Sequence, residues 1–84
     1  MYTDHLSRVT NPVTGESKLL GLVGARAQLG DYKHMYERVL AKLERDGEPK
    51  NAVQERCVAR LWDMAFKYEG WIQALETYLS GGEA

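Results

Sequence analysis

The 84-residue sequence has one cysteine, two prolines and no long apolar segment. With Cys57 alone, an intrachain disulfide framework and a multi-cysteine zinc site are excluded. No apolar run approaches the roughly 20 residues needed to cross a bilayer. Residues 1–5 lack the basic and apolar regions of a secretory signal. We therefore expect a soluble cytoplasmic protein with no membrane partner.

Net charge is also nearly absent. Eleven Lys and Arg residues against twelve Asp and Glu residues give a formal charge of -1, which argues against a protein that coats a long polyanion. The 44% hydrophobic and 27% charged residues are typical of a folded chain, and the length allows one small domain, residues 1–84.

Recognised catalytic and ligand-binding motifs are missing as well. Residues 20–26, LGLVGAR, lack the Lys-Ser or Lys-Thr ending of a phosphate loop. His34 stands between Asp31 and Glu37, but helical metal sites need several carboxylates and usually two histidines. Cys57 falls in a predicted apolar seam, where a thiol acts as a small hydrophobe. We predict no catalytic residue, metal ligand or cofactor, and no enzyme.

Residues 1–23 predict a β-hairpin or an extended arm. The turn signal is NPVTGE at 11–16, in which proline presets φ, Asn11 bonds its own backbone and Gly15 accepts a positive φ. The flanking segments 6–10 and 17–23 are candidates to pair as strands. A loop that leads into a short helix is the alternative.

Two helices follow. Residues 24–46 carry one apolar stripe at helical spacing, and Gly47 follows as a stop. Residues 49–79 begin at Pro49 and carry a heptad seam, Cys57, Leu61, Met64, Tyr68, Trp71, Leu75 and Tyr78. Residues 80–84 form a short tail. Because the connection is brief, the prediction is a mainly α protein built on an antiparallel two-helix hairpin.

The second helix is too long for a compact domain of this size. Thirty residues extend about 45 Å, whereas a globule of 84 residues is about 30 Å across. The helix therefore bends, with Gly70 as the candidate position, or protrudes and is completed by oligomerisation. The alternative is that the N-terminal segment folds back over its last turns.

Aromatic residues on this helix are candidates for a partner or oligomer interface. Trp62 and Phe66 lie off the seam, one turn apart. Either the N-terminal leucines and valines cover this pair, or the pair is an interaction hot spot. The full interface prediction is Trp62, Phe66, Trp71 and Tyr78.

Basic residues from both helices are predicted to share one face. Each helix carries its basic stripe on the same rotational side of its seam, and in antiparallel helices equal offsets fall on one side. The candidates for anion binding are Arg38, Lys42, Arg56, Arg60 and Lys67. This face either binds an anion or is only solvated.

The sequence favours a small non-enzymatic binding protein, such as an inhibitor, adaptor or regulatory subunit, that acts by covering a surface of a partner. The expected partners are a further copy of the chain and an unidentified protein. The alternative function is an anion-binding module for a nucleotide or a nucleic-acid backbone.

Overall fold

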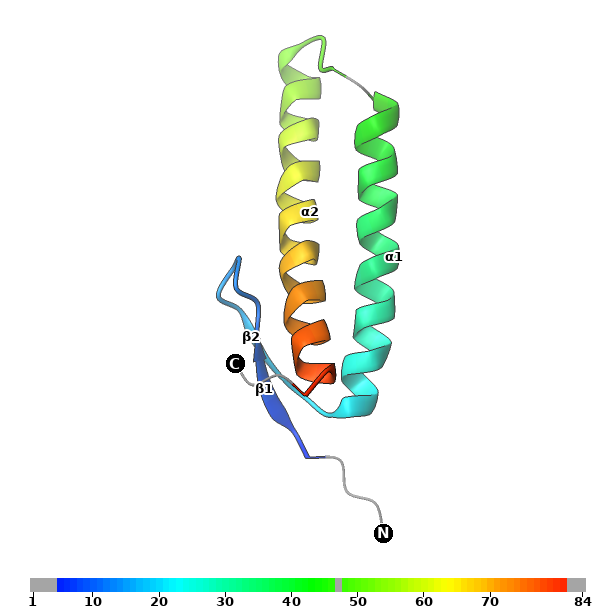
Figure 1. Cartoon of the computed structure of the whole chain (residues 1–84). Helices are drawn as coiled ribbons and strands as arrows, with labels where there is room; N and C mark the ends of the chain where they lie inside the picture. The colour runs from blue at the N-terminus through cyan, green and yellow to red at the C-terminus, as the bar shows by residue number, and fades with distance from the viewer. Residues whose placement is uncertain (1–4, 47, 82–84) are drawn as a thin grey trace.

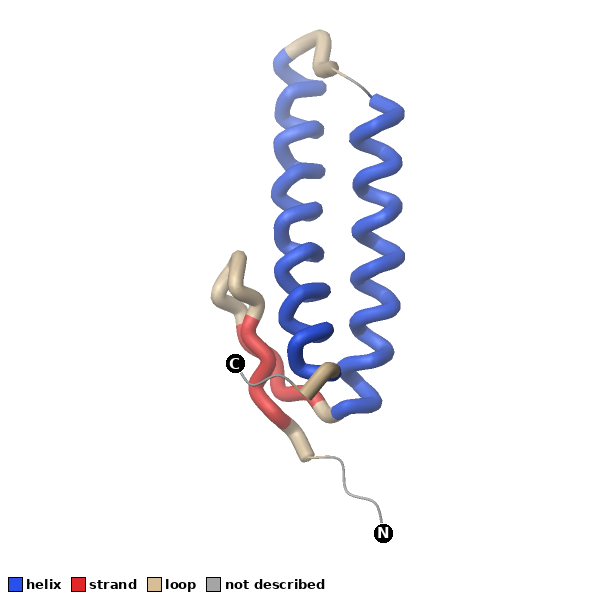
Figure 2. Tube along the Cα trace, viewed as in Figure 1, coloured by secondary structure: helices blue, strands red, loops and turns tan. Residues whose placement is uncertain are grey.

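The computed structural model describes residues 5–46 and 48–81. In chain order the elements are β1 (Ser7–Thr10), β2 (Ser17–Leu20), α1 (Leu22–Asp46) and α2 (Ala52–Leu79). Figures 1 and 2 show the two helices side by side, with the β-hairpin against the end of the pair that is remote from the helix connection. The predicted fold, a mainly α helical hairpin with a small N-terminal β-hairpin, is confirmed. The predicted stop at Gly47 and the ends of the arm and tail, 1–4 and 82–84, lie outside the described residues.

The β-hairpin forms around the predicted turn. Strands β1 and β2 are antiparallel, with Ser7 opposite Leu20 and Thr10 opposite Ser17. Asn11 closes the loop in two ways: its carbonyl accepts from Gly15 N at 2.8 Å, and its side-chain Oδ1 accepts from Val13 N at 2.9 Å. Gly15 has φ of 79°, so the turn uses the conformational freedom that was expected of this glycine.

The helix boundaries differ slightly from the prediction. Helix α1 begins two residues earlier than expected, at Leu22. Helix α2 begins three residues later than expected, because Asn51 is its N-cap and accepts a hydrogen bond from Gln54 N at 2.9 Å. Pro49 therefore precedes the helix instead of occupying its first turn. At the other end Gly81 takes a φ of 81° after the last helical residue.

The core lies where the β-hairpin packs on the helices. Its buried side chains come from all four elements and are Val9, Leu20, Ala25, Trp71 and Leu75. This observation corrects the interface prediction for Trp71, which is completely buried inside its own chain. Tyr78 is half-buried beside this core and donates a hydrogen bond from its hydroxyl to the Leu20 carbonyl at 3.3 Å. The N-terminal segment does fold back over this end of α2.

Lys18 of β2 completes the aromatic part of the core. Its Nζ lies 4.7 Å from the centroid of the Trp71 ring and donates to the Tyr32 hydroxyl at 2.5 Å. The Tyr32 and Trp71 rings are stacked, with centroids 6.0 Å apart. A cation over aromatic faces is attracted by their π-electrons, so Lys18 links the hairpin to both helices.

The hairpin approaches α2 closely at Gly70. Helix α2 runs through it without interruption. A Cβ at position 70 would overlap Asn11 Oδ1 and lie 2.9 Å from Asn11 Cγ. The missing side chain lets buried Asn11 donate from its Nδ2 to the Lys67 carbonyl at 3.0 Å. The prediction of a bend at Gly70 is wrong because this glycine serves a close approach instead.

The molecule is long and thin, with principal extents of 57 × 21 × 17 Å. The helices protrude beyond the β-hairpin. We call residues 22–36 and 67–79 the proximal half of the helix pair, and residues 37–46 and 52–66 the distal half. The β-hairpin packs on the proximal half, whereas the distal half has two helices and no third layer among the described residues (Figure 1). Among the described residues, neither helix is long and apolar enough to cross a membrane.

Candidate interaction surfaces

The distal half presents an exposed pair of aromatic rings, which we call the aromatic patch. Trp62 and Phe66 are 46% and 51% exposed, and their rings stack with centroids 5.9 Å apart. At 100° per residue both side chains lie more than about 90° away from the seam that faces α1. The N-terminal leucines and valines do not cover this pair, because the hairpin packs lower on α2, around Gly70 and Trp71. The prediction that they would cover it is wrong.

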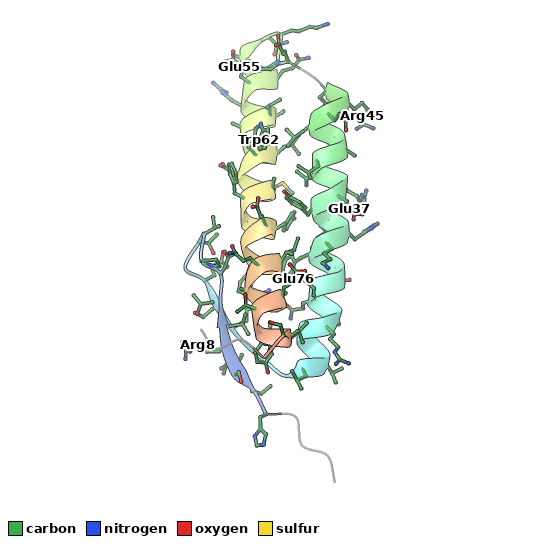
Figure 3. The ribbon with its side chains drawn as sticks, viewed as in Figure 1. Arg8, Glu37, Arg45, Glu55, Trp62 and Glu76 are labelled. Carbon is green, nitrogen blue, oxygen red and sulfur yellow. The ribbon has the colours of Figure 1, made fainter. Side chains whose placement is uncertain are left out.

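Helix geometry places acidic residues on the same side of the helix pair as the aromatic patch. On α2, Glu55 and Glu69 lie within about 60° of the two rings around the helix axis. On α1, Glu37 and Glu44 fall at the rotational offset from the seam that places them on the same face of the pair. Figure 3 shows Glu55 at the start of α2 and Glu37 pointing away from α2. This side of the helix pair therefore carries two aromatic rings and four glutamates, of which Glu69 lies just across the boundary in the proximal half.

Tyr36 and Glu69 join the helices where the two halves meet. The Tyr36 hydroxyl donates to Glu69 Oε2 at 3.5 Å. Partial burial, followed by the negative charge of Glu69 and this hydrogen bond, raises the pKa of Tyr36 above its usual value.

The broadly opposite face of the helix pair carries a groove with an apolar floor, which lies mainly in the distal half. Two adjoining hollows share Lys42, Leu61 and Met64 and so form one depression along the helix pair. Its floor is made by Met35 and Val39 of α1 and by Val53, Cys57, Leu61 and Met64 of α2. The β-hairpin covers the equivalent face in the proximal half, so the floor continues the surface that the hairpin buries lower down.

Basic side chains line both sides of this floor, and we call the whole feature the basic groove. Lys42, Arg56 and Arg60 line the hollow next to the helix connection. Arg38, Lys42 and Arg45 line the adjoining one. The structure thus brings four of the five predicted anion-binding residues, Arg38, Lys42, Arg56 and Arg60, around one depression. Lys67 is separate: its Nζ lies 3.7 Å from Glu16 Oε1 of the hairpin loop.

The basic groove has little compensating negative charge. Asp46 also lines it, but its Oδ1 lies 3.9 Å from Arg45 Nε. Across residues 5–46 and 48–81, no carboxylate forms an ion pair with Arg38, Lys42, Arg56 or Arg60. Like charges that lie close together without counter-charges favour an anionic partner.

The two residues considered for catalysis or metal binding are surface residues. Cys57 is exposed on the floor of the basic groove, which corrects its predicted place in a buried seam. Its seam position is exposed because no described segment of the chain forms a third layer on the distal half. His34 is exposed on α1. Among the described residues there is no group of three or more His, Cys, Asp or Glu side chains that could hold a metal ion.

Two important contacts were not predicted from the sequence. The Asn11–Gly70 approach and the position of Lys18 over Trp71 both join the hairpin to α2. Asn11 and Gly70 each stood out, as a turn residue and as a helical glycine, but their pairing depends on how the hairpin docks. No local pattern marks Lys18.

Comparison with known proteins gives no match: no family model, no curated protein and no solved structure is significantly similar to this chain. The surfaces described above are therefore the basis for the functional argument.

Proposed function

We propose that the chain is a small non-enzymatic binding protein that acts by covering a surface of another protein. The observation that carries this proposal is the aromatic patch, in which two stacked rings stay half-exposed on a face that no described part of the chain covers. Large aromatic side chains supply much of the energy of protein interfaces because they bury a large area and lose few rotamers. An inhibitor, adaptor or regulatory subunit would present such a patch.

Replacing Trp62 by alanine separates binding from folding. Trp62 is 46% exposed, so we expect Trp62→Ala to change the free energy of unfolding by less than about 1 kcal/mol. We expect the same change to weaken partner binding by at least about 2 kcal/mol, which is roughly 30-fold in Kd. Urea unfolding measures the change in the free energy of unfolding. A binding titration with the partner, on the same protein preparation, measures the change in Kd.

Site-specific photo-cross-linking identifies what the aromatic patch touches. A benzophenone amino acid replaces Phe66 in one version of the full chain and His34 in a control version, since both positions are exposed. We expect a protein adduct at position 66 that is weak at position 34 and is lost when Trp62→Ala is added. Equal labelling at both positions, or labelling that ignores Trp62→Ala, would contradict the proposal.

The basic groove favours a second candidate function, anion binding. Its supporting observation is that Arg38, Lys42, Arg56 and Arg60 line one depression without ion-pair partners among the described residues. A nucleotide or nucleic-acid backbone bound there would dissociate as salt increases, and Arg56→Glu with Arg60→Glu would abolish binding. If neither a panel of nucleotides nor a short duplex binds in a salt-dependent way, this candidate function is excluded.

A further inference from the structure

We infer that the aromatic patch of one copy of this chain binds the basic groove of a second copy. This inference rests on the proposed function, since both use Trp62 and Phe66 as contact residues, and it adds a second copy of the chain as a partner of the same patch. The two surfaces lie on broadly opposite faces of the helix pair. Each copy can therefore use one face for each of two neighbours.

Charge complementarity is the first argument. By helix geometry Glu37, Glu44, Glu55 and Glu69 fall on the side of the helix pair that carries the patch, whereas Arg38, Lys42, Arg56 and Arg60 line the groove. The cations lack ion-pair partners among the described residues, so a partner that brings carboxylates would compensate them. Complementary charge also orients the copies, because patch against patch or groove against groove would place like charges together.

The apolar surfaces match as well. Between the basic side chains the floor of the groove is Val53, Cys57, Leu61 and Met64, which offers a nucleotide phosphate or a duplex backbone nothing to bond. The two stacked aromatic rings would pack on the apolar floor, and the nearby carboxylates would pair with the basic side chains at the rim. A phosphate ligand would satisfy the rim alone, so the groove favours a protein surface.

The proximal half shows how the chain covers this face of the helix pair. In the proximal half the same face of the helix pair is covered by the β-hairpin, which buries Trp71 and Leu75 completely. In the distal half Val53 remains 68% exposed on that face. Docking of a neighbour's α2 would add the missing third layer along the rest of the pair, as the hairpin does lower down.

This mode of association is heterologous, since different surfaces meet. Repetition of one heterologous contact gives a ring if the rotation closes and an open stack if it does not. We therefore expect the mass of the full chain to grow with concentration beyond a dimer or to reach a closed ring. We also expect self-association to weaken when salt rises from about 0.05 M to about 0.5 M, because the contact is charged at its rim.

Mixing two complementary variants tests the inference. The groove variant carries Arg56→Glu and Arg60→Glu, and the patch variant carries Trp62→Ala and Phe66→Ala. All four positions are exposed, and circular dichroism checks that each variant is folded. Sedimentation velocity should show each variant alone as a monomer. An equimolar mixture should form a 1:1 dimer and no larger species, because one intact patch meets one intact groove.

Controls separate charge from position. Arg8→Glu with Arg26→Glu changes net charge by the same amount at exposed arginines away from the groove, and should self-associate like the unmodified chain. Arg38→Glu with Lys42→Glu attacks the groove from α1 and should behave as the first groove variant does.

Four results would overturn the inference. The first is an unmodified chain that stays monomeric at millimolar concentration. The second is a groove variant that still self-associates through its patch, and the third is a mixture of the two variants that forms no dimer. The fourth is phosphate or a short duplex that binds a monomeric chain at the groove, which would assign this surface to the second candidate function. Cross-linking of a foreign protein at position 66 would support the proposed function even if the chain did not associate with itself. Failure of this inference is therefore distinct from failure of the proposed function.

Discussion

At the scale of single residues, Gly70 and Asn11 fix how the β-hairpin sits on α2. Asn11 is completely buried, and its side-chain amide bonds both its own turn and the Lys67 carbonyl of α2. Buried amides of this kind are stabilising only when their hydrogen bonds are made. Gly70 makes room for that bonding, although glycine inside a helix costs about 1 kcal/mol relative to alanine.

Substitution by alanine is therefore expected to change stability in opposite directions at Gly70 and at Gly30. We expect Gly70→Ala to lower the free energy of unfolding by about 1–3 kcal/mol, since the new Cβ overlaps Asn11. Gly30→Ala is the matched control: no atom lies within 4 Å of a Cβ there, so the helix gains about 0.5–1 kcal/mol. Chemical denaturation followed by circular dichroism measures both. A stabilising Gly70→Ala would contradict the observed contact.

Tyr36 gives a pH prediction at the same scale. Its pKa is raised in the folded chain, so the folded state holds the phenol proton more tightly than the unfolded state does. This contribution to stability is fully present below pH 10, the ordinary tyrosine pKa, and is lost as pH rises through the higher folded value.

Glu69→Gln checks the cause of that shift. The substitution removes the negative charge near the Tyr36 hydroxyl but leaves the burial, so we expect the Tyr36 pKa to fall part of the way toward its ordinary value. An NMR titration of the tyrosine ring carbons reads the value directly. An unchanged pKa in this variant would show that Glu69 does not act on Tyr36.

At the scale of elements, α2 depends on its N-cap because its first two turns are exposed. All residues from 52 to 57 are exposed, so tertiary packing does little to hold this end. Asn51→Ala removes the acceptor for Gln54 N and should cost about 1 kcal/mol in the free energy of unfolding. Asn51→Asp keeps an acceptor and is the control. If both variants were equally stable in thermal unfolding, the cap would have no role.

The elements were largely predictable from sequence, and their contacts were not. Apolar spacing of three and four residues located both helices, and the turn at 11–16 located the hairpin, because these signals are local. The heptad seam runs evenly from Cys57 to Tyr78, yet Trp71 is fully buried and Cys57 is exposed. Periodicity reports which side chains face inward along a helix. It does not report how far the hairpin reaches along that face.

The candidate surfaces were also predictable only in part. The common face of Arg38, Lys42, Arg56 and Arg60 was predictable, because two antiparallel helices with equal rotational offsets fix it. The separation of Lys67 from that group was not, because it results from docking of the hairpin loop with Glu16.

At the scale of the whole molecule, stability is expected to be uneven along the 57 Å axis. The proximal half holds the buried cluster around Trp71 and Leu75, whereas Val39 and Ala65 are the buried apolar residues described in the distal half. Regions with few buried contacts open locally at lower free energy than the core. In hydrogen exchange of a dilute sample we therefore expect amides near the helix connection to exchange well before those around Trp71. Uniform protection along both helices would contradict this picture.

The central claim is that the distal half is a binding surface, left uncovered by the described part of its own chain and covered by a second copy. Hydrogen exchange of the unmodified chain at low and high concentration tests it most directly. We predict that concentration slows exchange in residues 38–46 and 52–66, and that residues 7–20 of the β-hairpin do not change. Exchange that is independent of concentration, or protection that appears at the β-hairpin instead, would contradict the claim.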